Sequence, residues 1–117
     1  MSTSREITIR PWGFYEILHN EPGYQIKRIH VEAGKRLSLQ SHKHRSEHWY
    51  ISQGQGIVEV EDTLQTLVPG DTVTIGKEAI HRIQAAENVS ITFFEIQSGE
   101  YLGEDDIIRY EDDYGRA

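Results

Sequence analysis

The stretch that decides the fold is GKRLSLQSHKHRSEH, which covers residues 34–48. Side chains two positions apart share a face of a β-strand, so Gln40 and His42 face one way while Leu39 faces the other. One face of this strand is therefore apolar and the other presents metal-ligand groups. A turn follows, and Glu47 begins the next extended run, where an antiparallel neighbour would bring its carboxylate opposite His42. This arrangement predicts a strand that lines a polar cavity.

The same period-two alternation recurs in short runs along the rest of the chain. We expect strands at residues 24–31, 36–41, 47–52, 56–61, 63–68, 72–75, 80–85 and 89–97. Glycine-containing turns separate several of them, at 33–34, 53–56 and 68–71. Many short strands at this spacing indicate an all-β sandwich or barrel. The segment at residues 103–110 is expected to form either a short helix or a tail that packs against a barrel edge.

The composition fits a single globular domain over residues 1–117. The net charge of −7 argues against nucleic acid and anionic membranes as partners. No run approaches the ~20 consecutive apolar residues that span a bilayer, and the first residues lack the apolar core of a signal peptide. We therefore expect a cytoplasmic protein. Residues 7–9, Ile-Thr-Ile, form an apolar segment that invites strand exchange at a barrel edge and predicts a homodimer.

Four side chains with metal-binding groups are expected to meet inside the barrel, namely Gln40, His42, Glu47 and His81. The chain has no cysteine, so nitrogen and oxygen atoms must supply any metal ligands. Neutral imidazole binds several divalent metals. One carboxylate and one neutral amide leave the ion with a net positive charge, which preserves its strength as a Lewis acid. We expect one divalent ion at these residues, with room left for water or substrate.

The spacing of these residues resembles the first sequence motif of the cupin superfamily. That motif has Gly, His, His, Glu and Gly at fixed intervals, where this chain has Gly34, Gln40, His42, Glu47 and Gly54. The one departure is Gln40, and it points to the phosphomannose isomerase domain of the type II (bifunctional) family. Further stretches similar to that family are residues 10–13, 37–40, 44–49, 81–82 and 97–106.

This resemblance implies a cupin double-sheet antiparallel β-barrel, or jelly roll. It implies the interconversion of mannose 6-phosphate and fructose 6-phosphate, so the expected partner is a phosphorylated sugar. The implied cofactor is a divalent metal ion, zinc first, with cobalt, manganese or nickel as substitutes. The type II enzymes commonly add an N-terminal mannose-1-phosphate guanylyltransferase. No glycine-rich nucleotide-binding segment occurs here, so we do not expect that activity from this chain.

The motif leaves the proton-shuttling base open between Glu95 and His44. Arg45 is tethered between His42 and Glu47, and guanidinium groups match phosphate oxygens. We therefore expect Arg45 to bind the substrate phosphate and to contribute to catalysis. Weaker candidates for substrate binding are Arg82, Lys35 and Arg36.

Two other functions fit the same residues. His42, His81 and Glu47 alone would form the two-histidine, one-carboxylate set of iron oxygenases. Gln40 argues against this, because it fills a position that oxygen and substrate need. A non-catalytic cupin that binds sugar or metal is the second alternative, since the second cupin motif keeps His81 but not most of its other residues.

Overall fold

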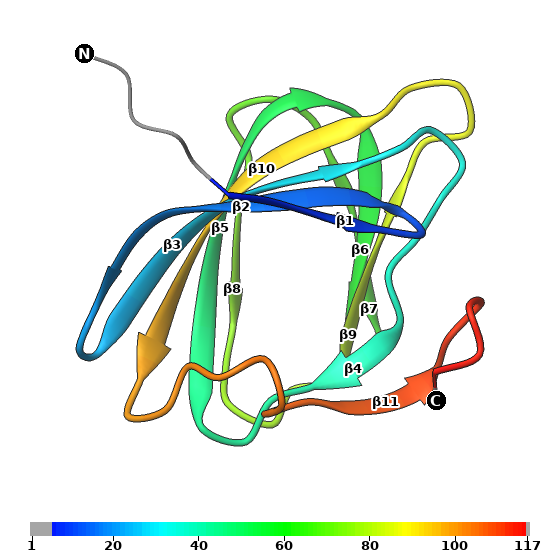
Figure 1. Cartoon of the computed structure of the whole chain (residues 1–117). Helices are drawn as coiled ribbons and strands as arrows, with labels where there is room; N and C mark the ends of the chain where they lie inside the picture. The colour runs from blue at the N-terminus through cyan, green and yellow to red at the C-terminus, as the bar shows by residue number, and fades with distance from the viewer. Residues whose placement is uncertain (1–5, 117) are drawn as a thin grey trace, which may run out of the picture.

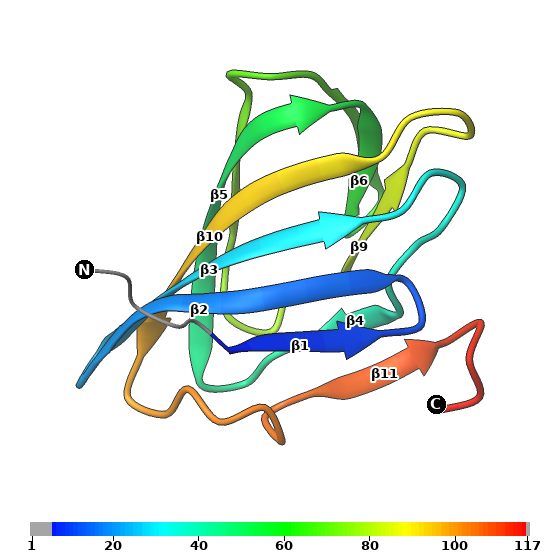
Figure 2. The same cartoon turned by 45° about the horizontal axis from the view of Figure 1, so that its top comes forward.

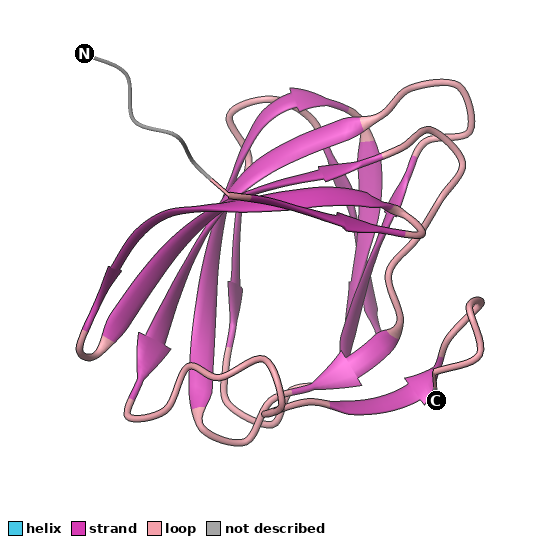
Figure 3. Ribbon diagram, viewed as in Figure 1, coloured by secondary structure: helices cyan, strands magenta, loops and turns pink. Residues whose placement is uncertain are grey.

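The computed structural model describes residues 6–116, which form eleven strands and no helix (Figures 1 and 3). In chain order the strands are β1 Ile7–Arg10, β2 Gly13–Glu21, β3 Tyr24–Val31, β4 Leu39–Ser41, β5 Arg45–Gly54, β6 Gly56–Val60, β7 Thr63–Leu67, β8 Thr72–Ile75, β9 His81–Ala85, β10 Ile91–Gly99 and β11 Ile108–Glu111. Within this range, therefore, no helix could span a membrane.

The strands form two sheets that face each other across the interior (Figure 1). The larger sheet has the order β1-β2-β3-β10-β5-β8, and the smaller has the order β11-β4-β9-β6-β7. All pairs are antiparallel, and β10 lies between β3 and β5 (Figure 2). The predicted all-β double-sheet barrel is confirmed.

The inward-facing side chains change from apolar to polar along the central strands of the larger sheet. On β5, Ile51 and Trp49 face the interior, and Glu47 and Arg45 follow toward the start of the strand. The neighbouring strand β10 changes in the same direction. Its register pairs Phe93 with Ile51, Glu95 with Trp49, and Gln97 with Glu47. One end of the barrel is therefore a hydrophobic core and the other is a buried polar cavity.

The apolar end supplies the stability that the polar end lacks. Its most deeply buried side chains include Phe93, Ile51, Ile83, Ile91 and Val31. Burial of each such side chain contributes roughly 1.5–3 kcal/mol. The sheet that presents the polar groups is thus anchored by core packing along the same strands.

The turn from β5 to β6 requires glycine at residue 54. Gly54 has a positive φ of 89°, a backbone conformation that costs glycine little. A Cβ at this position would lie 1.8 Å from the carbonyl oxygen of Ser90. The last glycine of the motif therefore serves the tight approach of two chain segments.

The prediction of a short helix within residues 103–110 is wrong. Residues Ile108–Glu111 form strand β11, which pairs with β4 and places Arg109 opposite Gln40. The pairing gives the edge of β4 hydrogen-bond partners, which a helix could not supply. Arg109 lines the cavity, and the next residue, Tyr110, contacts the Ser41 hydroxyl at 2.9 Å. The segment therefore has the period of a strand.

Other differences concern the ends of the sheets. Within residues 7–21 only the apolar segment 7–9 was expected at a barrel edge, yet β1 and β2 form a hairpin that extends the larger sheet. The strand predicted at 36–41 is reduced to β4, and Arg36 makes only an isolated bridge to Gln84. By contrast, the strand predicted at 24–31 is confirmed as β3.

Candidate metal centre

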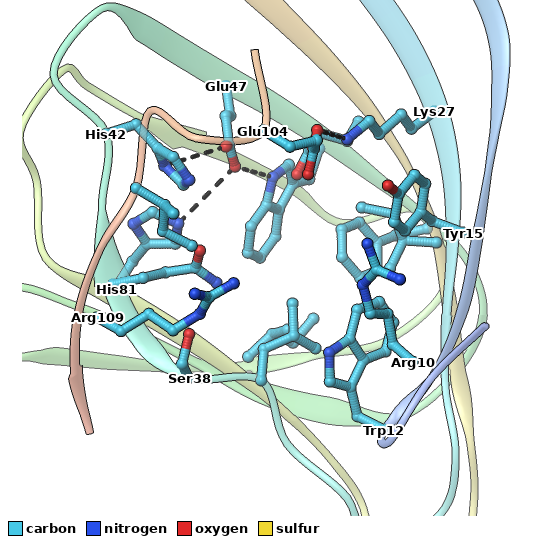
Figure 4. Close-up of a pocket in the computed structure, with 18 of the residues that line it drawn as sticks. Arg10, Trp12, Tyr15, Lys27, Ser38, His42, Glu47, His81, Glu104 and Arg109 are labelled. Atoms are coloured by element: carbon cyan, nitrogen blue, oxygen red, sulfur yellow. Dashed lines mark hydrogen bonds and ion pairs between the residues drawn. The ribbon is translucent and has the colours of Figure 1, made fainter. Parts of the chain in front are cut away.

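Three metal-binding side chains meet at the polar end of the interior (Figure 4). His42 directly follows β4, Glu47 lies on β5, and His81 begins β9. One donor atom from each lies within 4.8 Å of the others, and all three residues are buried. Glu47 Oε2 is 3.4 Å from His42 Nδ1, and Glu47 Oε1 is 3.8 Å from His81 Nε2. This cluster could hold a metal ion.

The His81 ring is oriented by the backbone. Its Nδ1 lies 2.9 Å from the carbonyl oxygen of Ala79. Because a carbonyl oxygen only accepts, Nδ1 carries the proton and donates it. The lone pair of His81 is therefore on Nε2, the nitrogen that faces Glu47. This is the tautomer that a metal ligand needs.

His42 is held in the neutral form. Burial, followed by the positive charge of Arg45, lowers its pKa to about 3. Arg45 Nη2 donates a hydrogen bond to His42 Nε2 at 3.0 Å. At neutral pH the imidazole therefore has no positive charge to repel a cation, and its Nε2 lone pair accepts the hydrogen bond from Arg45.

Glu47 is the anionic member of the cluster. Burial is the largest single effect and raises the pKa of Glu47, but the charge of Arg45 and the hydrogen bonds and charges of the other neighbours together outweigh it, and the pKa is lowered. Arg45 Nε donates to Glu47 Oε2 at 3.0 Å, and Trp49 Nε1 donates to Oε1 at 3.0 Å. Both oxygens are thus oriented by neighbours on the same strand. The buried Arg45 guanidinium contacts His42 and Glu47 together, at the place where a divalent cation would compete with it.

Gln40 is brought to this cluster by strand pairing. On β4 it lies opposite His81 of β9 on one side and Arg109 of β11 on the other. It is buried and lines the same cavity as the three clustered residues. The donor set of this end of the barrel is therefore two imidazoles, one carboxylate and one amide. Such a nitrogen and oxygen set fits a divalent transition metal or zinc.

Glu95 is a second buried carboxyl group in the cavity. Burial, followed by the negative charge of Glu47, raises its pKa to about 7. Gln97 Nε2 donates a hydrogen bond to Glu95 Oε2 at 2.6 Å. Near neutral pH, Glu95 can therefore both release and accept a proton, as a general acid–base group must.

His44, the other candidate base, lies outside this cavity. Its Nδ1 is 3.5 Å from Glu100 Oε1, and its ring packs edge-on against Tyr101. The turn after His42 directs this side chain toward the loop at residues 100–106, and it does not line the cavity.

Three of the cations expected to bind substrate also lie away from the cavity. Arg82 faces β11, where its Nη1 donates to Glu111 Oε1 at 3.1 Å. Arg36 forms an exposed pair with Asp113 at 2.7 Å, and Lys35 is exposed. Of the predicted substrate-binding residues, Arg45 alone lines the cavity.

Sequence reasoning did not single out four other cations that line the cavity: Arg10, Lys27, Arg109 and Arg116. Lys27 lies two positions before Ile29 on β3, so the alternation of that strand could have placed it inside. The expectation of a helix over its segment gave no reason to place Arg109 inside the barrel. These residues make the cavity more basic than the total charge of the chain suggests.

Comparison with known sequences gives one family. The sequence profile of the mannose-6-phosphate isomerase C-terminal family matches residues 2–112. The xanthan biosynthesis protein XanB of Xanthomonas campestris is 42% identical over 108 residues, which cover 92% of this chain and 23% of that protein. A mannose-1-phosphate guanylyltransferase of Sinorhizobium fredii is 44% identical over 105 residues, which cover 90% of this chain and 20% of that protein. This chain therefore spans less than a quarter of the length of either relative.

Comparison with solved structures gives the fold. A cupin-2 domain protein of Rhodospirillum rubrum, Rru_A2000, superposes with a TM-score of 0.74 at 19% identity, over 87% of this chain and 78% of that chain. Oxalate decarboxylase of Bacillus subtilis superposes with a TM-score of 0.81 at 16% identity, over 91% of this chain and 30% of that chain. At such low identity the likeness concerns the fold alone, and the barrel has the cupin fold.

Proposed function

The chain belongs to the mannose-6-phosphate isomerase C-terminal family, and from this premise we propose that it interconverts mannose 6-phosphate and fructose 6-phosphate with a divalent metal ion. One observation carries the proposal. Glu95, a buried carboxyl group with a pKa of about 7, lines the same cavity as the metal-competent cluster of His42, Glu47 and His81. An isomerase of this kind needs such a pairing of a cation site with a group that can move a proton.

In this proposal Gln40, His42, Glu47 and His81 hold the ion. We place zinc first, and cobalt, manganese and nickel ions bind the same ligand types. When bound, the ion would polarise the oxygens on the two reacting carbons and stabilise negative charge there. The neutral His42 imidazole and the ionised Glu47 carboxylate are the protonation states that such binding requires.

Glu95 would move the proton between the two carbons. Its carboxylate would remove the proton from carbon 2 of the aldose, the released electron pair would form a C1–C2 double bond, and the C1–O π electrons would move to the oxygen on carbon 1, which takes the proton of the hydroxyl group on carbon 2. The oxygen on carbon 2 would then re-form a carbonyl group while the C1–C2 π electrons take the proton back from Glu95 at carbon 1, which leaves the ketose. The hydrogen bond from Gln97 keeps the carboxyl group in one orientation.

The proposed partner is a phosphorylated sugar, and we infer a cytoplasmic location. The absence of cysteine supports a reducing compartment. A buried cavity that is rich in arginine and lysine supports an anionic substrate despite the net charge of −7.

The test is a coupled assay that detects fructose 6-phosphate formed from mannose 6-phosphate by the zinc- or cobalt-loaded protein. Activity should disappear with a chelator and return with metal. Glu95→Gln should lower kcat by roughly 10²–10⁴-fold and still bind metal. Glu87→Gln, an exposed carboxyl group, is the matched control. If the metal-loaded parent forms no fructose 6-phosphate, the proposal is rejected.

An iron oxygenase is the second candidate, because the clustered residues are two histidines and one carboxylate. Oxygen consumption by the iron(II)-loaded protein, without isomerase activity, would favour it. A chain that binds metal and sugar phosphate with neither activity would be a non-catalytic binding module.

A further inference from the structure

The cavity contains two guanidinium groups with no acidic partner among residues 6–116. Five lysine and arginine side chains line it. Three of them form ion pairs, which are Arg45 with Glu47, Lys27 with Glu104, and Arg116 with Asp112. The other two, Arg10 and Arg109, form no such pair within the described range, and no hydrogen bond or ion pair joins them to the other side chains drawn in Figure 4. Their charge is therefore available to an anion from solution.

Arg109 is the more constrained of the two. Its Nε is buried and has no hydrogen-bond partner in the described part of the chain. A buried donor without a partner is costly, and native structures rarely retain one without a reason. Burial and the nearby positive charges of Arg116 and Arg10 lower the pKa of Arg109, and the charges of Asp112 and Glu104 oppose them, but a guanidinium remains charged. The cavity thus holds a cation that forms no ion pair within residues 6–116 and has a free donor.

Arg10 approaches from the other side of the cavity (Figure 4). It ends β1, at the edge of the larger sheet, whereas Arg109 lies on β11, at the edge of the smaller sheet. The Arg10 guanidinium packs over the Tyr15 ring at 5.4 Å, and its Nη1 donates to the carbonyl oxygen of Ile9 at 3.1 Å. These contacts orient Arg10 and leave it donors to spare.

We propose that Arg109 and Arg10 together bind the phosphate group of a sugar monophosphate. The identification of the ligand as a sugar phosphate rests on the proposed isomerase function, whereas the anion site is inferred from the residues that line the cavity alone. A phosphate monoester carries about two negative charges at neutral pH, and two planar guanidinium groups match its oxygens.

The position of this site suits a substrate that also reaches the metal centre. Arg109 lies opposite Gln40, and Gln40 lies opposite His81. With neighbouring strands about 4.8 Å apart, the phosphate would lie one to two strands from the metal-binding residues. The sugar carbons would occupy the space between. Arg45 would remain beside Glu47, where it is already hydrogen-bonded.

Calorimetric titration tests the site. The zinc-loaded chain is titrated with mannose 6-phosphate and, separately, the metal-free chain is titrated with inorganic phosphate, so that zinc cannot account for phosphate binding. Arg109→Gln and Arg10→Gln should each weaken both interactions by about tenfold or more, which is about 1.4 kcal/mol. Lys77→Gln removes a positive charge from an exposed loop and should change neither affinity by more than about twofold. Arg109→Lys keeps the charge but loses the planar fork, and should give an intermediate loss.

The outcomes separate this proposal from the isomerase proposal. If both glutamine variants are folded and bind mannose 6-phosphate within about twofold of the parent, the phosphate site is overturned, whatever the isomerase activity. If Arg109→Gln does not fold, Arg10→Gln and Arg109→Lys decide in the same way. If phosphate binding depends on the two arginines but no fructose 6-phosphate forms, the site stands and the isomerase reaction fails. If neither phosphate compound binds the parent, the site is rejected.

Discussion

Asp106→Asn should weaken the metal centre although Asp106 is not a metal ligand. Its carboxylate accepts hydrogen bonds from the backbone N–H groups of Lys43 at 3.0 Å and His44 at 2.9 Å. Burial raises the pKa of Asp106, but these two bonds outweigh burial and lower it. The bonds hold the turn that directly follows His42. The loop before β11 therefore fixes the position of one of the clustered histidines.

The expected loss of stability follows from the hydrogen bond that the asparagine amide cannot accept. Asparagine keeps one accepting oxygen and replaces the other with an NH₂ group, which faces a backbone donor. The variant loses one charge-assisted hydrogen bond, so the free energy of unfolding of the metal-free protein should fall by about 1–3 kcal/mol. Because groups that orient metal ligands contribute about 10–100-fold to affinity, zinc should bind Asp106→Asn that much more weakly.

Two measurements check this prediction. Urea unfolding of the metal-free protein gives the stability, and competition with a chromophoric chelator gives the zinc affinity. Asp62→Asn, an exposed carboxyl group in the turn between β6 and β7, is the matched control and should behave as the parent. If Asp106→Asn lost stability but bound zinc within about twofold of the parent, the turn would not position His42, and the reasoning would fail.

Two further predictions concern pH and assembly. In the metal-free protein, the raised pKa of Glu95 means that its stabilising effect is complete below pH 4.5 and is lost as the pH rises through about 7. Glu95→Gln does not titrate, so its free energy of unfolding relative to the parent should rise by roughly 3 kcal/mol across this window. Urea unfolding at each pH measures this difference. If the difference stayed constant, the raised pKa of Glu95 would be contradicted. Ile7 and Ile9 are 52% and 72% exposed on the edge strand β1. We therefore expect the parent to sediment as a homodimer and the Ile9→Lys variant to sediment as a monomer. A monomeric parent in sedimentation velocity would refute this prediction.

The central part of the fold could be predicted from local alternation, because each strand there has one buried and one exposed face. β3 is an example. The spacing of Gln40, His42 and Glu47 in the sequence also indicated that these three side chains lie near one another. β11 could not be predicted in this way. It has only four residues, and pairing with β4 stabilises it more than its own pattern does. Local sequence cannot report such long-range pairing.

The basic lining of the cavity was missed for a related reason. Arg10 and Arg109 lie far apart in the chain, and they line the same cavity from β1 and β11, the edge strands of the two sheets. Arg82 was a weaker candidate than Arg45 because successive residues of a strand point to opposite faces. In the structure it does not line the cavity, although it adjoins His81 in strand β9.

The division of the metal-competent cluster between the two sheets has a kinetic consequence. His81 belongs to the smaller sheet and His42 directly follows its strand β4, whereas Glu47 belongs to the larger sheet. An ion bound by all three would join the sheets at the end of the barrel where apolar packing is weakest. Release of the ion would then require the sheets to move apart, so the off-rate of the metal would follow the opening rate of the barrel. Amide hydrogen exchange in β5 and in β9 would slow together when metal is added, by the same factor on both sides of the cavity.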